Sequence, residues 1–171
     1  MQRAHRVLRR GDAVVDLGCW PGGWLQCAAA AVGREGRVVG VDLAAIEPPL
    51  EIGNAVALTG DLEDPALAGV LRAALGRERC DVLLSDAAPK LTGIRDVDRA
   101  HEERLLEAVE RLLGELLRPG GRLLVKILEG PEAQAIDKRI RSRFARAKTV
   151  KTEATRKGST ERYLLAADFR G

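Results

Sequence analysis

The sequence predicts an α/β fold of the Rossmann type, a mostly parallel sheet with helices on both faces. Short apolar runs bounded by Gly, Asp or Pro alternate with longer segments of helical period, which is typical of such a sheet. Polar residues also stand directly after several apolar runs, where open parallel sheets bind their ligands.

Seven apolar runs are expected to be strands: Ala13–Leu17, Arg37–Val41, Ala55–Leu58, Asp81–Leu84, Arg122–Ile127, Ala147–Lys151 and Tyr163–Ala167. Four periodic segments are expected to be helices: Gly23–Val32, Pro65–Leu75, Val97–Leu117 and Pro131–Arg143. The third of these helices should end before the Arg118–Gly121 turn, because no helix continues through its Pro-Gly-Gly sequence.

Length and composition favour one soluble domain. The 171 residues are about the size of a single domain, and the chain is 46% hydrophobic and 31% charged. No apolar run is long enough to span a bilayer, and the first ten residues lack the apolar core of a signal peptide. We therefore expect a cytoplasmic monomer that makes no membrane contact.

Three scattered cysteines and two histidines make a disulfide framework or a metal site improbable. The net charge of +3 hides a basic segment, residues 137–157, which carries nine basic residues against two acidic ones. Its charge of +7 leaves −4 for the remainder of the chain. Such a segment favours a polyanion such as RNA, although a solvated helix face and loop would have the same composition.

The expected turn after the first strand, Asp16–Trp24, contains Gly18, Gly22 and Gly23. These glycines let the backbone approach a ligand closely. The turn lacks the GxGxxG spacing that seats a pyrophosphate, so it favours a ligand without phosphates. The alternative is a tight strand-to-helix turn with no ligand.

Carboxylates follow the next strands. Asp42 stands about twenty residues beyond the glycines, where a carboxylate accepts hydrogen bonds from the ribose of an adenosine, although NAD would fit equally. Asp61 is placed to accept from an adenine amino group, or to act as a turn or helix-cap aspartate.

Three further residues are candidates for the chemistry. Asp86 follows the fourth strand and precedes a rigid Pro turn. Lys126 lies inside an apolar run, where a lysine needs a function or a partner unless it points outward from an edge strand. Glu161 opens the last strand and could close the far side of the same crevice, but says little on its own.

Six stretches, DLGCWPGGW, VVGVDL, GDLED, SDAAPKLTG, LLVKILEG and STERYLLA, together resemble the successive motifs of the FtsJ (RrmJ-like) family of 2′-O-ribose methyltransferases. The resemblance runs from about Val7 to Ala167. Its specific parts are the PGGW loop and the SDxAP turn, because other adenosylmethionine-binding proteins share only the glycines and the ribose carboxylate.

The resemblance implies the class I methyltransferase fold, with seven strands of which the last is antiparallel. It implies S-adenosyl-L-methionine as cofactor and S-adenosylhomocysteine as product. Cofactor contacts are expected from these motifs, at Gly18, Cys19, Pro21, Gly22, Gly23, Trp24, Asp42, Leu43, Asp61, Leu62 and Asp86.

The resemblance also implies a catalytic Lys-Asp-Lys-Glu set, of which Asp86, Lys126 and Glu161 are present. Our hypothesis is an in-line displacement in which Lys126 is the general base or orients the ribose hydroxyl, with Asp86 and Glu161 holding its amine. The implied substrate is a uridine of large-subunit ribosomal RNA. RNA contacts are expected at Arg139, Arg143, Lys148, Lys151, Arg156 and Lys157.

The first lysine of the set is missing, because its position in the family falls ahead of Met1 and the first lysine here is Lys90. We expect one methyltransferase domain over residues 1–171, without the family's N-terminal helix. The competing hypothesis is a non-catalytic FtsJ-like protein that binds adenosylmethionine or RNA. An NAD-dependent oxidoreductase is disfavoured by the missing pyrophosphate glycines, and an amino-directed methyltransferase by SDAAP in place of its (N/D)PP(Y/F) turn.

Overall fold

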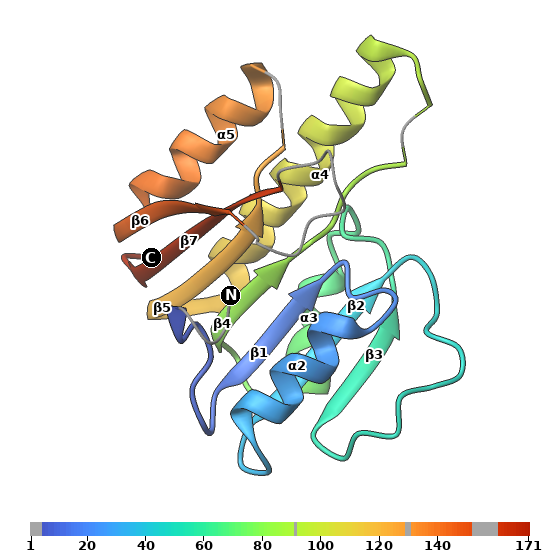
Figure 1. Ribbon diagram of the computed structural model, residues 1–171, viewed down its shortest axis with the longest axis vertical. Helices are drawn as coiled ribbons and strands as arrows, with labels where there is room; N and C mark the ends of the chain where they lie inside the picture. The colour runs from blue at the N-terminus through green and yellow to red at the C-terminus, as the bar shows by residue number, and fades with distance from the viewer. Residues whose placement is uncertain (1–4, 91, 129–130, 152–160) are drawn as a thin grey trace.

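The strands of the protein form one mixed sheet in the order β3-β2-β1-β4-β5-β7-β6 (Figure 1). The structure is a computed structural model and describes residues 5–90, 92–128, 131–151 and 161–171. The strands are β1 (Ala13–Leu17), β2 (Arg37–Asp42), β3 (Ala55–Thr59), β4 (Cys80–Ser85), β5 (Leu117–Lys126), β6 (Phe144–Lys151) and β7 (Arg162–Phe169). The helices are α2 (Gly23–Val32), α3 (Leu67–Leu75), α4 (Arg95–Leu116) and α5 (Pro131–Ser142).

All neighbouring pairs from β3 to β5 are parallel, whereas β7 pairs antiparallel with both β5 and β6. Only β7 therefore runs against the other strands of the sheet, which confirms the predicted fold class. The carboxyl ends of the other strands and the amino end of β7 consequently meet at one edge. Parallel sheets of this kind bind ligands at that edge.

Helices cover both faces of the sheet, as Figure 1 shows. Apolar side chains of α3, α4 and α5 pack with one face in a single buried cluster. The opposite face is covered by α2 together with Val7 and Leu8. Because both faces are buried, the central strands are apolar almost throughout, and all five residues of β1 are buried.

A buried ion pair fastens the segment before β1 to the middle of the sheet. Arg122 of β5 donates from Nη2 to Asp12 Oδ1 at 2.7 Å and from Nη1 to the carbonyl oxygen of Val7 at 2.5 Å. Both charged side chains are 9% exposed. Their mutual pairing offsets the cost of taking two charges out of water.

The predicted elements are all present, and most bounds differ by one to three residues. The largest difference lies at β5, which begins at Leu117 instead of Arg122 because Leu117 pairs with Cys80 of β4. The pairing is irregular between Cys80 and Val82, so the predicted turn Arg118–Gly121 lies within the strand. Helix α4 accordingly ends one residue before the predicted Leu117. In the described part of the chain, no helix is long and apolar enough to cross a membrane.

Candidate active site

The loop between β1 and α2 lies directly against the turn that follows β4. Gly18 has a φ of +80°, and a Cβ at this position would lie 2.7 Å from the Cα of Ala87. Gly22 has a φ of +102°, and a Cβ there would lie 2.8 Å from a methyl group of Leu50. Gly18 therefore requires glycine for its backbone conformation and for space, whereas Gly22 requires it for its backbone conformation.

The remaining residues of this loop have different environments. Cys19 is buried with its Sγ against Gly40, whereas Pro21 and Gly23 are exposed. Trp24 is half-buried, and its ring packs on the ring of Tyr163 with centroids 5.4 Å apart. The predicted cofactor loop is therefore exposed on one side, and Trp24 connects it to β7.

Asp42 ends β2 with its carboxylate held by backbone groups. Oδ2 accepts the N–H of Trp20 at 3.0 Å, and Oδ1 accepts the N–H of Ala44 at 3.1 Å. These two bonds orient the carboxylate before any ligand arrives. The neighbouring Leu43 side chain is 72% exposed, so it offers apolar surface beside the carboxylate.

The loop after β3 carries Asp61 and Leu62. Asp61 is exposed and accepts the N–H of Glu63 at Oδ1 over 2.9 Å, so one of its oxygens has the turn-forming role considered above. The other oxygen, Oδ2, accepts no hydrogen bond from a described residue. Leu62 is buried in the cluster beneath α3 and α4, which anchors the loop.

Asp16 is a fully buried carboxylate at 0% exposure. Neither of its oxygens has a hydrogen-bond partner among the described residues. Burial and the negative charges of Asp86 and Asp42 raise the pKa of the Asp16 carboxyl to about 7. A buried group without a partner is costly, and a cationic ligand would supply one.

Lys126, Asp86 and Glu161 meet at the carboxyl edge of the sheet. The Nζ of Lys126 lies 2.8 Å from Glu161 Oε1 and 3.4 Å from Asp86 Oδ1. Glu161 reaches the lysine because the antiparallel register of β7 sets Tyr163 opposite Lys126. The interpretation of Lys126 as an edge-strand lysine is wrong, since β5 lies between β4 and β7.

Tyr163 completes this cluster. Its hydroxyl donates to Asp86 Oδ1 at 2.8 Å and lies 3.3 Å from Glu161 Oε2. Burial, with the hydrogen bond to Asp86 and the nearby negative charges, raises the pKa of the Tyr163 hydroxyl far above its usual value. The hydroxyl is therefore a permanent proton donor within the cluster.

The charge state of Lys126 follows from opposing effects. Desolvation lowers the pKa of its ammonium, but the hydrogen bond to Glu161 and the charges of Asp86 and Glu161 outweigh desolvation and raise that pKa. The hydrogen bond and charge of Lys126 in turn outweigh desolvation and lower the pKa of Glu161. Lys126 is thus an ammonium between two carboxylates, and its side chain is 20% exposed.

The predicted RNA-binding residues divide into paired and unpaired side chains. Arg139 forms a bidentate pair with Glu110, its Nη2 lying 2.6 Å from Oε2, and the guanidinium of Arg143 lies over the ring of Phe169. Lys148 and Lys151 are exposed on β6 and pair with no described residue. The last two predicted residues, Arg156 and Lys157, lie outside the described residues.

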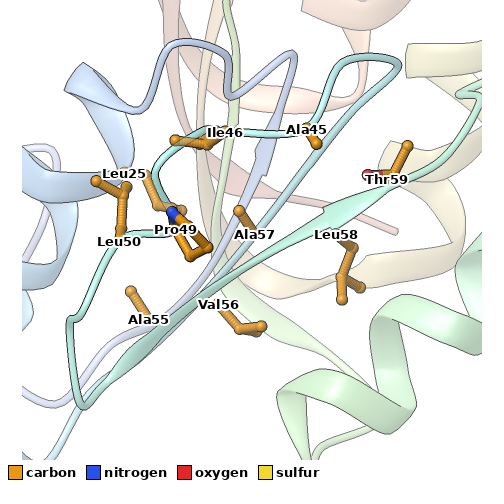
Figure 2. A pocket seen from close by; sticks show the side chains of 10 residues that line it. All are labelled: Leu25, Ala45, Ile46, Pro49, Leu50, Ala55, Val56, Ala57, Leu58 and Thr59. Atoms are coloured by element: carbon orange, nitrogen blue, oxygen red, sulfur yellow. The ribbon is translucent and has the colours of Figure 1, made fainter.

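An apolar pocket of about 290 Å³ lies beside edge strand β3 (Figure 2). Its lining is apolar apart from Thr59, and it includes Ile46 and Leu50 from the segment after β2. Strands β2 and β1 separate it from β4 and Lys126. Within the described residues, no group of three or more His, Cys, Asp or Glu side chains could hold a metal ion.

Comparison with known proteins decides the family. The sequence pattern of the family described as FtsJ-like methyltransferase matches residues 1–169. The chain belongs to the FtsJ-like methyltransferase family. This confirms the predicted family and the predicted enzyme class.

Named relatives agree with this assignment. The "Ribosomal RNA large subunit methyltransferase E" of Methanothermobacter thermautotrophicus is 41% identical over 172 residues, covering 100% of this chain and 80% of the relative. The protein of the same name from Cenarchaeum symbiosum is 37% identical over 171 residues, covering 100% of this chain and 85% of the relative.

Two solved structures share the fold of this FtsJ-like chain. A ribosomal RNA methyltransferase from Plasmodium falciparum has a TM-score of 0.81 at 22% identity, covering 99% of this chain and 93% of that one. Aeropyrum pernix fibrillarin, solved with bound S-adenosyl-L-methionine, has a TM-score of 0.69 at 19% identity, covering 94% of this chain and 68% of that one.

Sequence reasoning missed two residues of the site. Tyr163 was predicted only as the start of a strand, yet it is the single tyrosine of the chain and stands two positions after Glu161. Side chains two apart on a strand share a face, and this spacing was the available signal. Asp16 was read as part of the glycine motif, and nothing in the sequence indicated that its carboxylate would be buried without a partner.

Proposed function

We propose that this methyltransferase transfers the methyl group of S-adenosyl-L-methionine to a ribose 2′-hydroxyl of large-subunit ribosomal RNA. The observation that carries the proposal is the Lys126 ammonium between Asp86 and Glu161, at the sheet edge where the glycine loop and Asp42 also lie. The substrate class is proposed from the relatives named above. The ribose hydroxyl is proposed as the methyl acceptor from the family motifs.

The residues at this edge fit the cofactor, which supplies the methyl group as a sulfonium and also carries an ammonium, a ribose diol and an adenine amine. Asp42 is oriented by backbone amides to accept from a diol, and Asp61 Oδ2, which accepts from no described residue, can accept from an amine. The buried carboxylate of Asp16 has no hydrogen-bond partner in the described part of the chain and matches a cationic ligand. The glycines keep the loop clear of side chains that would fill this space.

In this proposal Lys126 positions the acceptor. Because its pKa is raised, the resting ammonium donates a hydrogen bond to the ribose oxygen and stabilises negative charge that develops on it. Asp86 and Glu161 hold the ammonium in place, and the Tyr163 hydroxyl holds Asp86. The balanced reaction forms the 2′-O–methyl bond, breaks the sulfur–methyl bond and releases S-adenosylhomocysteine and the hydroxyl proton.

The test compares wild type with Lys126→Ala, using tritiated cofactor and large subunits from cells that lack the endogenous enzyme. We expect wild type to label alkali-resistant dinucleotides, which identifies 2′-O transfer. Lys126→Ala should lose about 10²-fold or more of this activity while binding S-adenosylhomocysteine with nearly unchanged affinity in calorimetry.

Two results would contradict the proposal. Wild-type transfer by Lys126→Ala would remove the lysine from the reaction. Cofactor binding by wild type without any transfer to naked RNA or subunits would favour the non-catalytic binding protein.

A further inference from the structure

Arg111 of helix α4 binds the backbone of the loop after β3. Arg111 Nη2 donates to the carbonyl oxygens of Leu62 at 2.9 Å and Asp64 at 3.1 Å. Its Nη1 lies 3.0 Å from Glu115 Oε1, one helical turn along α4. The guanidinium is therefore fixed on its own helix while it binds the backbone on both sides of Glu63.

The internal hydrogen bonds of this loop are local. Asp61 Oδ1 accepts the N–H of Glu63, the carbonyl of Asp61 accepts the N–H of Asp64, and Asp64 Oδ1 accepts the N–H of Ala66. Such bonds shape a turn but do not set its place on the protein. Placement comes from the buried Leu62, the Gly60 N–H bond to the Asp42 carbonyl at 2.9 Å, and Arg111.

An exposed ion pair adds a weaker contact between the same elements. Arg104 of α4 lies 3.7 Å from Glu63, and both side chains are at least half exposed. Exposed pairs contribute little because water and salt screen them. Arg111 is only 32% exposed and donates to two backbone carbonyl oxygens, those of Leu62 and Asp64, so it is the stronger tie.

We infer that Arg111 is a positioning residue for recognition of the cofactor's adenine, an inference that rests on the proposed cofactor site. Asp61 precedes the two held carbonyls, and one of its oxygens is already committed to the turn. Its second oxygen reaches an adenine amino group only when the loop is held in one place, because a hydrogen bond weakens steeply with distance and angle. Arg111 supplies that hold from outside the site.

The experiment measures calorimetric affinities for S-adenosylhomocysteine and for S-inosylhomocysteine, in which a carbonyl oxygen replaces the adenine amino group. Wild type should prefer the adenine form, because the Asp61 carboxylate accepts from an amino group and is repelled by a carbonyl oxygen. Arg111→Met should reduce this preference about tenfold, mainly by lowering the affinity for S-adenosylhomocysteine. Arg111→Lys should restore part of the preference.

Arg79→Met is the matched control. Arg79 Nη1 likewise donates to two backbone carbonyls, those of Gly114 at 2.7 Å and Leu117 at 3.1 Å, but at the amino end of β4. It should leave the adenine preference unchanged. In an Asp61→Asn background, Arg111→Met should have no further effect on the preference, because Arg111 acts through Asp61.

Equal weakening of both nucleosides by Arg111→Met would overturn the inference, as would an additive effect in the Asp61→Asn background. If Arg111→Met does not fold, Arg111→Lys alone provides the test. The inference is then overturned if Arg111→Lys binds both nucleosides more weakly but keeps the wild-type preference for the adenine form. Failure of the proposed cofactor site is distinguishable, because wild type would then bind neither nucleoside, and failure of methyl transfer alone leaves both affinities measurable.

Discussion

Tyr163 is the residue that turns three charged side chains into one ordered cluster. Lys126 attracts both Asp86 and Glu161, but charge attraction alone does not fix the direction of a carboxylate. The Tyr163 hydroxyl bonds to Asp86 and reaches Glu161, and its ring is held by Trp24. A neutral donor between two carboxylates also reduces their mutual repulsion.

Tyr163→Phe should therefore lower kcat by about tenfold or more, since hydrogen bonds to charged groups contribute about 1.5 to 3 kcal/mol. KM and the affinity for S-adenosylhomocysteine should change little, because phenylalanine keeps the packing on Trp24. Steady-state methyl transfer, with calorimetry for the cofactor, separates these quantities. An unchanged kcat would show that the hydroxyl has no part in ordering the cluster.

Asp16 makes stability depend on pH near neutrality. Its folded-state pKa of about 7 lies above the ordinary value of 3.8, so the folded protein holds a proton that the unfolded chain has lost. The stability contribution is complete below pH 3.8, is lost as pH rises toward 7, and is absent above that. Between pH 5 and 8 the loss amounts to about 2 to 3 kcal/mol.

Asp16→Asn should remove this part of the pH dependence from the cofactor-free protein. Urea unfolding at pH 5 and pH 8 measures the difference, which should shrink by about 2 kcal/mol relative to wild type. Asp168→Asn is the control, because Asp168 is half exposed and paired with Arg146. The interpretation of Asp16 fails if both variants retain the wild-type difference.

At the level of single elements, helix α2 depends on a residue outside it. Its last carbonyls have no partner within the helix. The Asn54 side chain, just before β3, donates from Nδ2 to the carbonyl oxygens of Ala29 at 3.0 Å and Gly33 at 2.8 Å. This cap joins the carboxyl end of α2 to the edge of the sheet. It thereby supports the glycine loop, which lies at the amino end of the same helix.

Asn54→Ala should cost about 1 to 2 kcal/mol of unfolding free energy, because two side-chain hydrogen bonds are lost while each carbonyl keeps one backbone donor, the N–H of Gly33 or of Gly36. Asn54→Asp should cost more, because it also places a negative charge at the negative end of the helix dipole. Denaturant unfolding at constant pH ranks the three proteins. An aspartate variant as stable as the alanine variant would mean that the cap is not electrostatic in origin.

Across the whole molecule, the basic charges of residues 137–157 are only partly available to a partner. Arg139 is paired with Glu110, Arg141 with Asp137, and Arg146 with Asp168. Lys148 and Lys151 stand exposed on edge strand β6, without a partner among the described residues, and Lys151 lies at the same sheet edge as Lys126. Exposed lysines on an edge strand also discourage pairing with other chains.

If these lysines contact RNA phosphates, the double variant Lys148→Ala/Lys151→Ala should weaken RNA binding and reduce its salt dependence. The slope of log K against log salt should fall by about 1.4 to 1.8, since each phosphate contact contributes about 0.7 to 0.9. Binding measured over a salt series gives this slope. Arg146→Ala is the control, because Arg146 lies on the same strand but is paired with Asp168, and it should change the slope less. Equal slopes for wild type and the double variant would mean that the two lysines make no phosphate contacts and serve only to protect the edge strand.

The order of strands and helices followed from the sequence, because periodicity and turn residues act over a few positions. The bounds of β1 and α2 agree with prediction to the residue. The candidate residues Asp42, Asp61 and Asp86 were found because each follows an apolar run, and Lys126 because a lysine inside such a run needs a function or a partner.

Only the tertiary structure decided which of these side chains meet. Glu161 and Tyr163 join Lys126 because β7 pairs antiparallel with β5, a register that depends on contacts between distant segments. The pairing of Arg139 with Glu110 and the hold of Arg111 on the Asp61 loop likewise join elements far apart in sequence. Local patterns carry no information on such partners, since each depends on where a second element packs.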